Sequence, residues 1–261
     1  MRKKNHCMEK SRPVAARADL CSDASGQTTP AAVPALAPAD ASADASAAVP
    51  KAGDASFFEK HDKFLARAKS GPIGVLFLGD SITEGLAEVP HVWEFYFGKF
   101  HPANFGIGGD QTQHLIWRID HGELDGIHPK VVVLLIGTNN SGAHTAAQIV
   151  AAKTKIVRLI REKLPGAKVL LLAIFPRGRH PNRDGTVDSG VERMAVINAV
   201  NGELAKLEDG KNVRFLNLNA CFLQPDGTIL PRLMPDQLHL SAAGYKLWAE
   251  AMRPLLTELM G

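Results

Sequence analysis

Short, continuously apolar runs alternate along the chain with longer stretches in which apolar residues recur every three or four positions. The runs are typical of buried parallel strands, and the longer spacing is typical of amphipathic helices. The predicted strands are Ile73–Leu78, a short strand ending near Phe105, Val131–Ile136, Lys168–Ile174 and Val213–Leu216. The predicted helices are a short one from Phe57, one starting near Asp110, Ala146–Leu164, Val191–Leu207 and a last one with Ser241 as N-cap.

Strands that alternate with helices of this length predict βαβ units with right-handed crossovers. The chain is therefore expected to be an α/β protein with a parallel sheet of these five predicted strands. In such folds, ligands bind outside the carboxyl ends of the strands. Candidate site residues are accordingly sought directly after each strand.

The N-terminal part of the chain has a different composition. Between Ser22 and Ser56 it consists mainly of Ala, Pro, Ser and Asp, and such a segment cannot bury enough apolar surface to offset its ordering entropy. We expect residues 1–55 to form a disordered tail and residues 56–261 to form the folded domain. The basic start Arg2-Lys3-Lys4 is followed by no apolar signal-peptide core, which favours a cytoplasmic protein and leaves export open if the start codon is misassigned.

Composition excludes several classes of function. The 261 residues carry a formal net charge of only +3, which does not favour a nucleic-acid-binding protein. The longest apolar run, Val131–Ile136, is too short to cross a bilayer. The 3 cysteines show no Cys-x-x-Cys spacing, so no zinc site is expected.

A serine follows the first predicted strand, in the sequence Gly79-Asp80-Ser81. Its hydroxyl would be exposed at the carboxyl edge of the sheet, at the start of the next helix, where a nucleophile is well placed. A helix N-cap is the alternative role for Ser81. A second Asp-Ser pair, Asp188-Ser189, follows no predicted strand, and there the capping role is favoured.

A serine nucleophile needs a base, and the base needs an orienting acid. Two Asp-x-x-His segments are candidates. Asp125 and His128 precede a strand and would lie at the wrong edge of the sheet. Asp236 and His239 follow the last strand, where the carboxylate can reach the imidazole and fix its tautomer. The alternative for His239 is a buried histidine bonded to backbone.

Two further segments offer donors for a developing oxyanion. Phe105–Asp110 contains Gly106, Gly108 and Gly109, whose backbone N–H groups can face an anion. A dinucleotide fingerprint would need glycine at Gln111. Gly137–Asn140 could supply a side-chain amide. The alternatives are a flexible turn and an Asn-rich turn that satisfies its own backbone.

Together these segments resemble the SGNH (GDSL) hydrolase family, and more narrowly the esterases similar to the catalytic subunits of platelet-activating-factor acetylhydrolase Ib. The resemblance covers roughly residues 57–261. It is carried by Gly79-Asp80-Ser81-Ile82-Thr83, Val92-Trp93-Glu94, Asn104-Phe105-Gly106-Ile107-Gly108-Gly109-Asp110, Leu115-Ile116-Trp117-Arg118, Gly137-Thr138-Asn139-Asn140, Pro176-Arg177-Gly178-Arg179-His180-Pro181-Asn182 and His239-Leu240.

The resemblance implies a flavodoxin-like three-layer α/β/α domain that needs no cofactor or metal. It implies Ser81 as nucleophile, His239 as base and Asp236 as orienting acid. It also implies an oxyanion hole formed by the N–H groups of Ser81 and Gly109 and the side chain of Asn139. It suggests a homodimer.

The implied reaction is hydrolysis of a short acyl ester, with acetyl preferred and a small acetylated lipid or sugar as substrate. A basic segment after the fourth predicted strand could contact a polar or anionic leaving group, or could be a solvated loop. Its residues are Arg177, Arg179, His180 and Arg183. Alternatives that stay open are a xylan-type or sialic-acid-type carbohydrate acetylesterase, a thioesterase or lipase, and a catalytically silent binding module.

Overall fold

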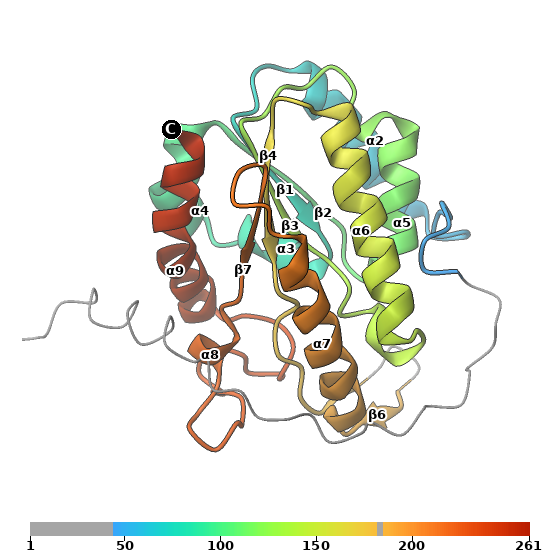
Figure 1. Cartoon of the computed structure of the whole chain (residues 1–261), viewed down its shortest axis with the longest axis vertical. Helices are drawn as coiled ribbons and strands as arrows, with labels where there is room; N and C mark the ends of the chain where they lie inside the picture. Colours follow the sequence, from blue (N-terminus) through green and yellow to red (C-terminus); the bar gives the residue numbers. More distant parts are fainter. Residues whose placement is uncertain (1–43, 182–184) are drawn as a thin grey trace, which may run out of the picture.

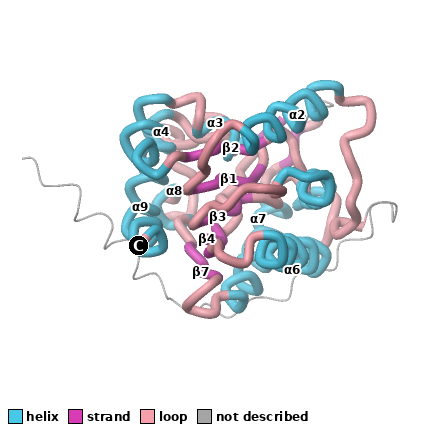
Figure 2. The backbone as a smooth tube through the Cα atoms, turned by 90° about the horizontal axis from the view of Figure 1, so that it is seen from above, coloured by secondary structure: helices cyan, strands magenta, loops and turns pink. Residues whose placement is uncertain are grey.

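The computed structural model describes residues 44–181 and 185–261. Its main sheet has five strands, all parallel, in the order β2-β1-β3-β4-β7 (Figures 1 and 2). The strands are β1 (Val75–Gly79), β2 (Pro102–Gly106), β3 (Val131–Leu135), β4 (Lys168–Leu172) and β7 (Val213–Leu216). This is the flavodoxin-like strand order, so the predicted five-stranded α/β fold is confirmed.

Helices cover both faces of the sheet, which gives three layers (Figure 2). One face carries α2 (Ala55–Lys69), α5 (Thr112–Arg118), α6 (Ala146–Lys163) and α7 (Val191–Leu204). The other carries α3 (Ser81–Leu86), α4 (Pro90–Phe97), α8 (Asn219–Phe222) and α9 (Ala242–Met260). Among the described residues, no helix is both long enough and apolar enough to cross a bilayer.

Side-chain alternation along the strands divides the core in two. In β1, Leu76 and Leu78 pack under α2, α5 and α6, whereas Val75 and Phe77 pack under α4 and α9. Every residue of β1 and β3 is buried. This two-sided burial explains why these strands are continuously apolar in the sequence.

The predicted element boundaries lie close to those observed, but several short elements were not predicted. They are α4, α8, a two-stranded antiparallel sheet of β5 (His180–Pro181) and β6 (Val187–Asp188), and short helical turns at Gly98–Phe100, Ile119–Glu123, Asn140–Gly142 and Ala205–Leu207. Elements this short carry too few apolar residues to show a period.

Residues 44–54, which we call the N-terminal strap, pack against the domain. Ala45 is fully buried, and its carbonyl accepts a hydrogen bond from Thr112 Oγ1 at 2.8 Å. The N–H of Val49 donates to Gln113 O, and Lys155 Nζ donates to Ser46 O at 2.8 Å. The packed domain therefore begins before the predicted boundary at residue 55, while residues 1–43 of the predicted tail lie outside the described residues.

A buried ion-pair cluster joins the sheet to α5. Arg118 is fully buried and pairs with Asp110 Oδ2 at 2.9 Å and with Glu123. Its guanidinium also donates to the carbonyls of Phe105 and Gly79, at the ends of β2 and β1. Burial raises the pKa of Glu123 to about 7, against the opposing attraction of Arg118. Arg118 is thus the cation that the two buried carboxylates share.

Replacing Arg118 by Leu should strongly destabilise the fold, because it leaves Glu123 buried without its partner and leaves Asp110 paired with Lys51 alone. The expected loss in the free energy of unfolding is about 3–5 kcal/mol, measured by urea denaturation. Arg158→Leu is the matched control, because Arg158 pairs with Glu162 on the surface with its side chain 65% exposed. That change should stay within about 0.5 kcal/mol. Equal losses in the two variants would contradict this account of the cluster.

Candidate active site

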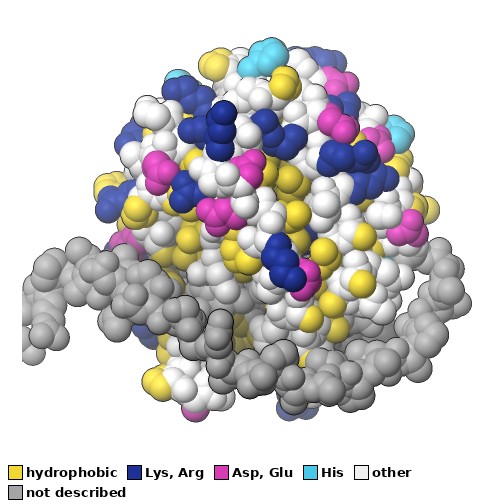
Figure 3. Space-filling model, in the orientation of Figure 1, with side chains coloured by type: hydrophobic (Ala, Val, Ile, Leu, Met, Phe, Trp, Pro, Cys, Tyr) yellow, Lys and Arg dark blue, Asp and Glu magenta, His cyan; other side chains and the backbone are white. Residues whose placement is uncertain are grey.

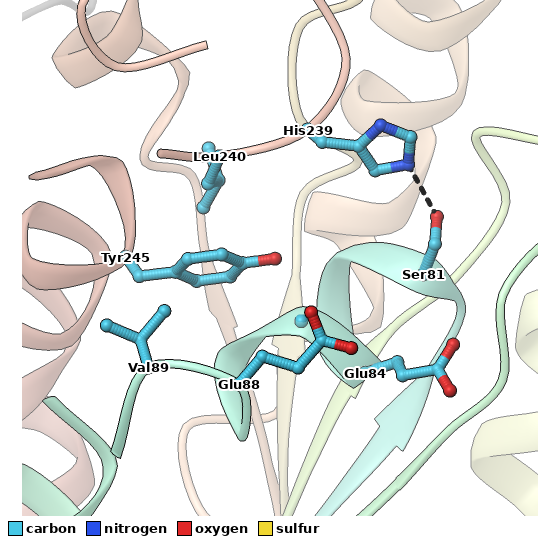
Figure 4. A pocket seen from close by; sticks show the side chains of 8 residues that line it. Ser81, Glu84, Glu88, Val89, His239, Leu240 and Tyr245 are labelled. Atoms are coloured by element: carbon cyan, nitrogen blue, oxygen red, sulfur yellow. Dashed lines mark hydrogen bonds between the residues drawn. The ribbon is translucent and has the colours of Figure 1, made fainter. Parts of the chain in front are cut away.

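Ser81 is the first residue of α3 and follows β1 with only Asp80 between them. Asp80 is the N-cap of α3, and its Oδ1 accepts a hydrogen bond from the N–H of Ile82 at 3.0 Å. The capping role weighed for Ser81 therefore belongs to Asp80. The Ser81 hydroxyl instead lies 2.9 Å from Nε2 of His239 (Figure 4).

The turn at Ser81 needs glycine before it. A Cβ at Gly79 would overlap the carbonyl oxygen of Leu135 and the hydroxyl of Thr83. Because Gly79 has no side chain, β1 can pack directly against β3 and α3 at the edge where Ser81 is presented.

His239 and Asp236 lie on the loop before α9. Nδ1 of His239 is 2.7 Å from Asp236 Oδ2, while Asp236 Oδ1 accepts from the N–H groups of Leu238 and His239. Burial alone would raise the pKa of Asp236, but the hydrogen bonds from His239 and Leu238 outweigh it and hold that pKa below its usual value. The structure thus brings Ser81, His239 and Asp236 into one hydrogen-bonded row.

The glycine-rich loop after β2 lies beside Ser81. It forms a turn in which the N–H of Asp110 donates to Ile107 O at 3.1 Å. A Cβ placed on Gly108 would be 3.8 Å from Cβ of Ser81, and Gly109 has a φ of +74°. The left-handed φ is the reason that glycine is needed at position 109.

The loop after β3 is tied to the glycine-rich loop. Asn139 Nδ2 donates to Asp110 O at 2.9 Å. Asn140 accepts from the N–H of Thr112 at 2.9 Å and donates to its hydroxyl at 3.0 Å. The asparagines therefore bridge two loops rather than only satisfying their own backbone, and they place Asn139 next to Gly109.

A cavity of about 360 Å³ opens beside the Ser81–His239 contact (Figure 4). It is lined by Ser81, Glu84, Gly85, Glu88, Val89, His239, Leu240 and Tyr245. Glu84 Oε2 accepts from the N–H of Gly108 at 2.7 Å, and Tyr245 donates to Ile82 O at 3.0 Å.

The polar lining residues of this cavity were not predicted from the sequence. Glu84 and Glu88 follow Ser81 at helical spacing, and Tyr245 lies one turn after the N-cap Ser241. That spacing is the sequence signal from which these lining residues could have been predicted.

The basic segment after β4 is only partly at the site. The His180 ring stands edge-on to the His239 ring at 5.7 Å, and its Nδ1 lies 3.0 Å from Asp236 O. Arg179 is exposed and its N–H donates to Gln237 Oε1. Arg177 is buried, with its N–H on Met194 Sδ. Arg183 lies outside the described residues.

One group of side chains has the composition of a metal site. Ligand atoms of His180, Asp236 and His239 all lie within 4.8 Å of one another. However, Nδ1 of His239 is bonded to Asp236, and its Nε2 to Ser81. A cation that used His239 would have to break this row, so a metal-free reaction stays the prediction.

The alternative pairs considered in the sequence are not part of this site. Asp125 and His128 precede β3, at the amino edge of the sheet, and Asp125 pairs there with Lys163 at 3.0 Å. The hydroxyl of Ser189 accepts from the N–H of Val191 at the start of α7. The N-cap of α7 is nevertheless Gly190, with no side-chain capping bond, so the capping role predicted for Ser189 is wrong.

Comparison with known proteins identifies a family and several relatives of this chain. The model of the GDSL-like lipase/acylhydrolase family matches residues 77–247. Platelet-activating factor acetylhydrolase IB subunit alpha1 of Bos taurus is 38% identical over 208 residues, which cover 80% of this chain and 85% of the bovine chain. Subunit alpha2 of Gallus gallus is 37% identical over 218 residues, covering 82% and 91%.

Solved structures confirm the fold. A GDSL-like lipase from Bacteroides thetaiotaomicron superposes with a TM-score of 0.62 at 17% identity, over 77% of this chain and 98% of the other. The acetyl xylan esterase AlAXEase gives a TM-score of 0.52 at 22% identity, over 70% and 98%. From the family match and these relatives, the chain belongs to the GDSL-like lipase/acylhydrolase family, and it is an ester hydrolase.

Proposed function

We propose that this protein is a serine esterase that hydrolyses short-chain acyl esters, acetyl esters foremost. The observation that carries the proposal is the hydrogen-bonded row from Ser81 through His239 to Asp236, with steps of 2.9 and 2.7 Å. A hydroxyl, an imidazole and a carboxylate in this order have the geometry of a nucleophile, its general base and the acid that orients the base.

In the proposed mechanism, Ser81 Oγ attacks the ester carbonyl while His239 Nε2 takes the hydroxyl proton. Asp236 accepts a hydrogen bond from Nδ1 of His239, which leaves the Nε2 lone pair facing Ser81 and stabilises the imidazolium that forms. The tetrahedral intermediate then collapses as His239 protonates the leaving alcohol. Water then attacks the acyl-enzyme while His239 takes its proton, and His239 returns that proton to Ser81 Oγ as the carboxylic acid leaves.

The oxyanion of the intermediate would be held by the N–H groups of Ser81 and Gly109 and by Nδ2 of Asn139. Two contacts support this assignment. The glycine-rich loop lies beside Ser81, and Asn139 is fixed next to it by one of its two amide hydrogens. The second hydrogen remains for the substrate.

The size of the cavity favours a small acyl group or a compact leaving group. Its volume of about 360 Å³ is near the lower end for small-molecule sites. The relatives named as acetylhydrolases support acetyl as the acyl group. The carboxylates of Glu84 and Glu88 make the lining partly polar, which also suits an acetylated sugar.

Hydrolysis of p-nitrophenyl acetate should depend on Ser81. Because the acyl-enzyme cannot form without the hydroxyl, Ser81→Ala is expected to lower kcat by about 10⁴-fold or more. Ser189→Ala is the matched control, since Ser189 also follows an aspartate but lies two residues before the start of α7. It should retain the wild-type rate. Activity that survives Ser81→Ala would refute the proposed nucleophile.

The acyl preference should appear in a series of p-nitrophenyl esters of increasing chain length. We expect kcat/KM to be highest for acetate and to fall at least about tenfold by octanoate, because each extra methylene must fit a cavity of only about 360 Å³. A rising profile would indicate a lipase or thioesterase instead. With the acetyl group fixed, rates on an acetylated phospholipid and on acetylated xylan then distinguish the two leaving-group classes.

A further inference from the structure

The central peptide of the glycine-rich turn has no strong conformational preference of its own. The turn runs from Ile107 to Asp110, closed by the Asp110 N–H on Ile107 O, with Gly108 and Gly109 in the middle. Gly109 has a φ of +74°, the value of the third residue of a type II turn. Types I and II differ by a flip of the central peptide, and two glycines resist neither form.

Lys51, from the N-terminal strap, contacts this peptide. Its Nζ donates to the carbonyl of Gly108 at 2.6 Å and pairs with Asp110 Oδ1 at 2.8 Å. The lysine side chain is only 9% exposed, and its ammonium group lies over the ring of Phe57 at 5.5 Å. Both partners are thus on the turn, and the cation is largely shielded from water.

The carbonyl of Gly108 and the N–H of Gly109 belong to one planar, trans peptide unit. They point in opposite directions, so a group that fixes the carbonyl also fixes the N–H. A cation on the carbonyl oxygen further polarises the peptide and makes its N–H a stronger donor. The N–H in question is the one proposed to bind the oxyanion.

We propose that Lys51 is a positioning residue that sets the Gly108–Gly109 peptide in the orientation needed for oxyanion binding. The inference rests on the proposed esterase function. Lys51 lies before residue 77, where the match to the family begins. The strap therefore contributes to the site from outside the matched region, and its docking couples an N-terminal segment to the rate of the chemical step.

The test measures kcat and KM for p-nitrophenyl acetate in Lys51→Met and Lys51→Arg. Loss of one oxyanion donor costs about 10²–10³ in kcat. Lys51→Met leaves the donor present but unoriented, so we expect kcat to fall about tenfold with KM within about twofold. Lys51→Arg, which keeps the cation, should regain most of the rate. Lys155→Met is the matched control, because Lys155 holds the same strap through Ser46 O and should keep the wild-type kcat.

Melting curves by circular dichroism accompany the kinetics, and Lys51→Gln replaces Lys51→Met if the latter does not fold. The proposal is overturned if the neutral variant keeps kcat within about twofold of wild type. It is also overturned if Lys51→Arg is no faster than the neutral variant, or if Lys155→Met loses as much. Wild-type protein without Ser81-dependent hydrolysis would instead refute the proposed function itself.

Discussion

The contact between Ser81 Oγ and His239 Nε2 joins residues 158 positions apart in the chain. It can form only if the sheet is assembled with β1 near its centre and the loop before α9 folded back over the same edge. Parallel strands deliver all their carboxyl ends to that edge, so one topological rule brings the serine, the glycine-rich loop, the asparagines and the Asp-His loop together. Because a hydrogen bond forms only over a short distance, the loop that carries His239 must also pack accurately against the end of β1.

Buried ion pairs stabilise the carboxyl edge of the sheet on the side that faces the core. Arg118 joins the carbonyls at the ends of β1 and β2 to Asp110, and Asp110 in turn pairs with Lys51. The same carboxylate therefore links the core of the domain to the strap. Glu84 adds a contact from the cavity side through the N–H of Gly108. The glycine-rich turn is thus held by charged side chains on several sides, as the proposed role in oxyanion binding requires.

Much of this arrangement could be predicted from the sequence because its signals are local. Continuous apolar runs marked β1, β3 and β4, and the order of motifs after the strands placed Ser81 and His239 on one edge. The capping role left open for Ser81 was decided only by the structure, since both Asp80 and Ser81 are good caps.

The packing of the strap could not be predicted from the sequence for a physical reason. The strap packs through hydrogen bonds to its backbone, the Lys51 ion pair and the small side chain of Ala45 rather than through large apolar side chains, so hydrophobic patterning predicts a tail there. The sequence also could not show that Arg177 is buried and Arg179 is exposed, because both arginines follow the same strand. The homodimer stays a prediction that rests on resemblance.

Covalent labelling is the most direct test of the central claim that Ser81, activated by His239, attacks the substrate. The folded wild-type protein is treated with a fluorophosphonate, and the modified peptide is identified by mass spectrometry. The account predicts a single adduct on Ser81 that is lost in His239→Ala, because an unactivated hydroxyl reacts slowly. Labelling of another residue, or none at all, would contradict it.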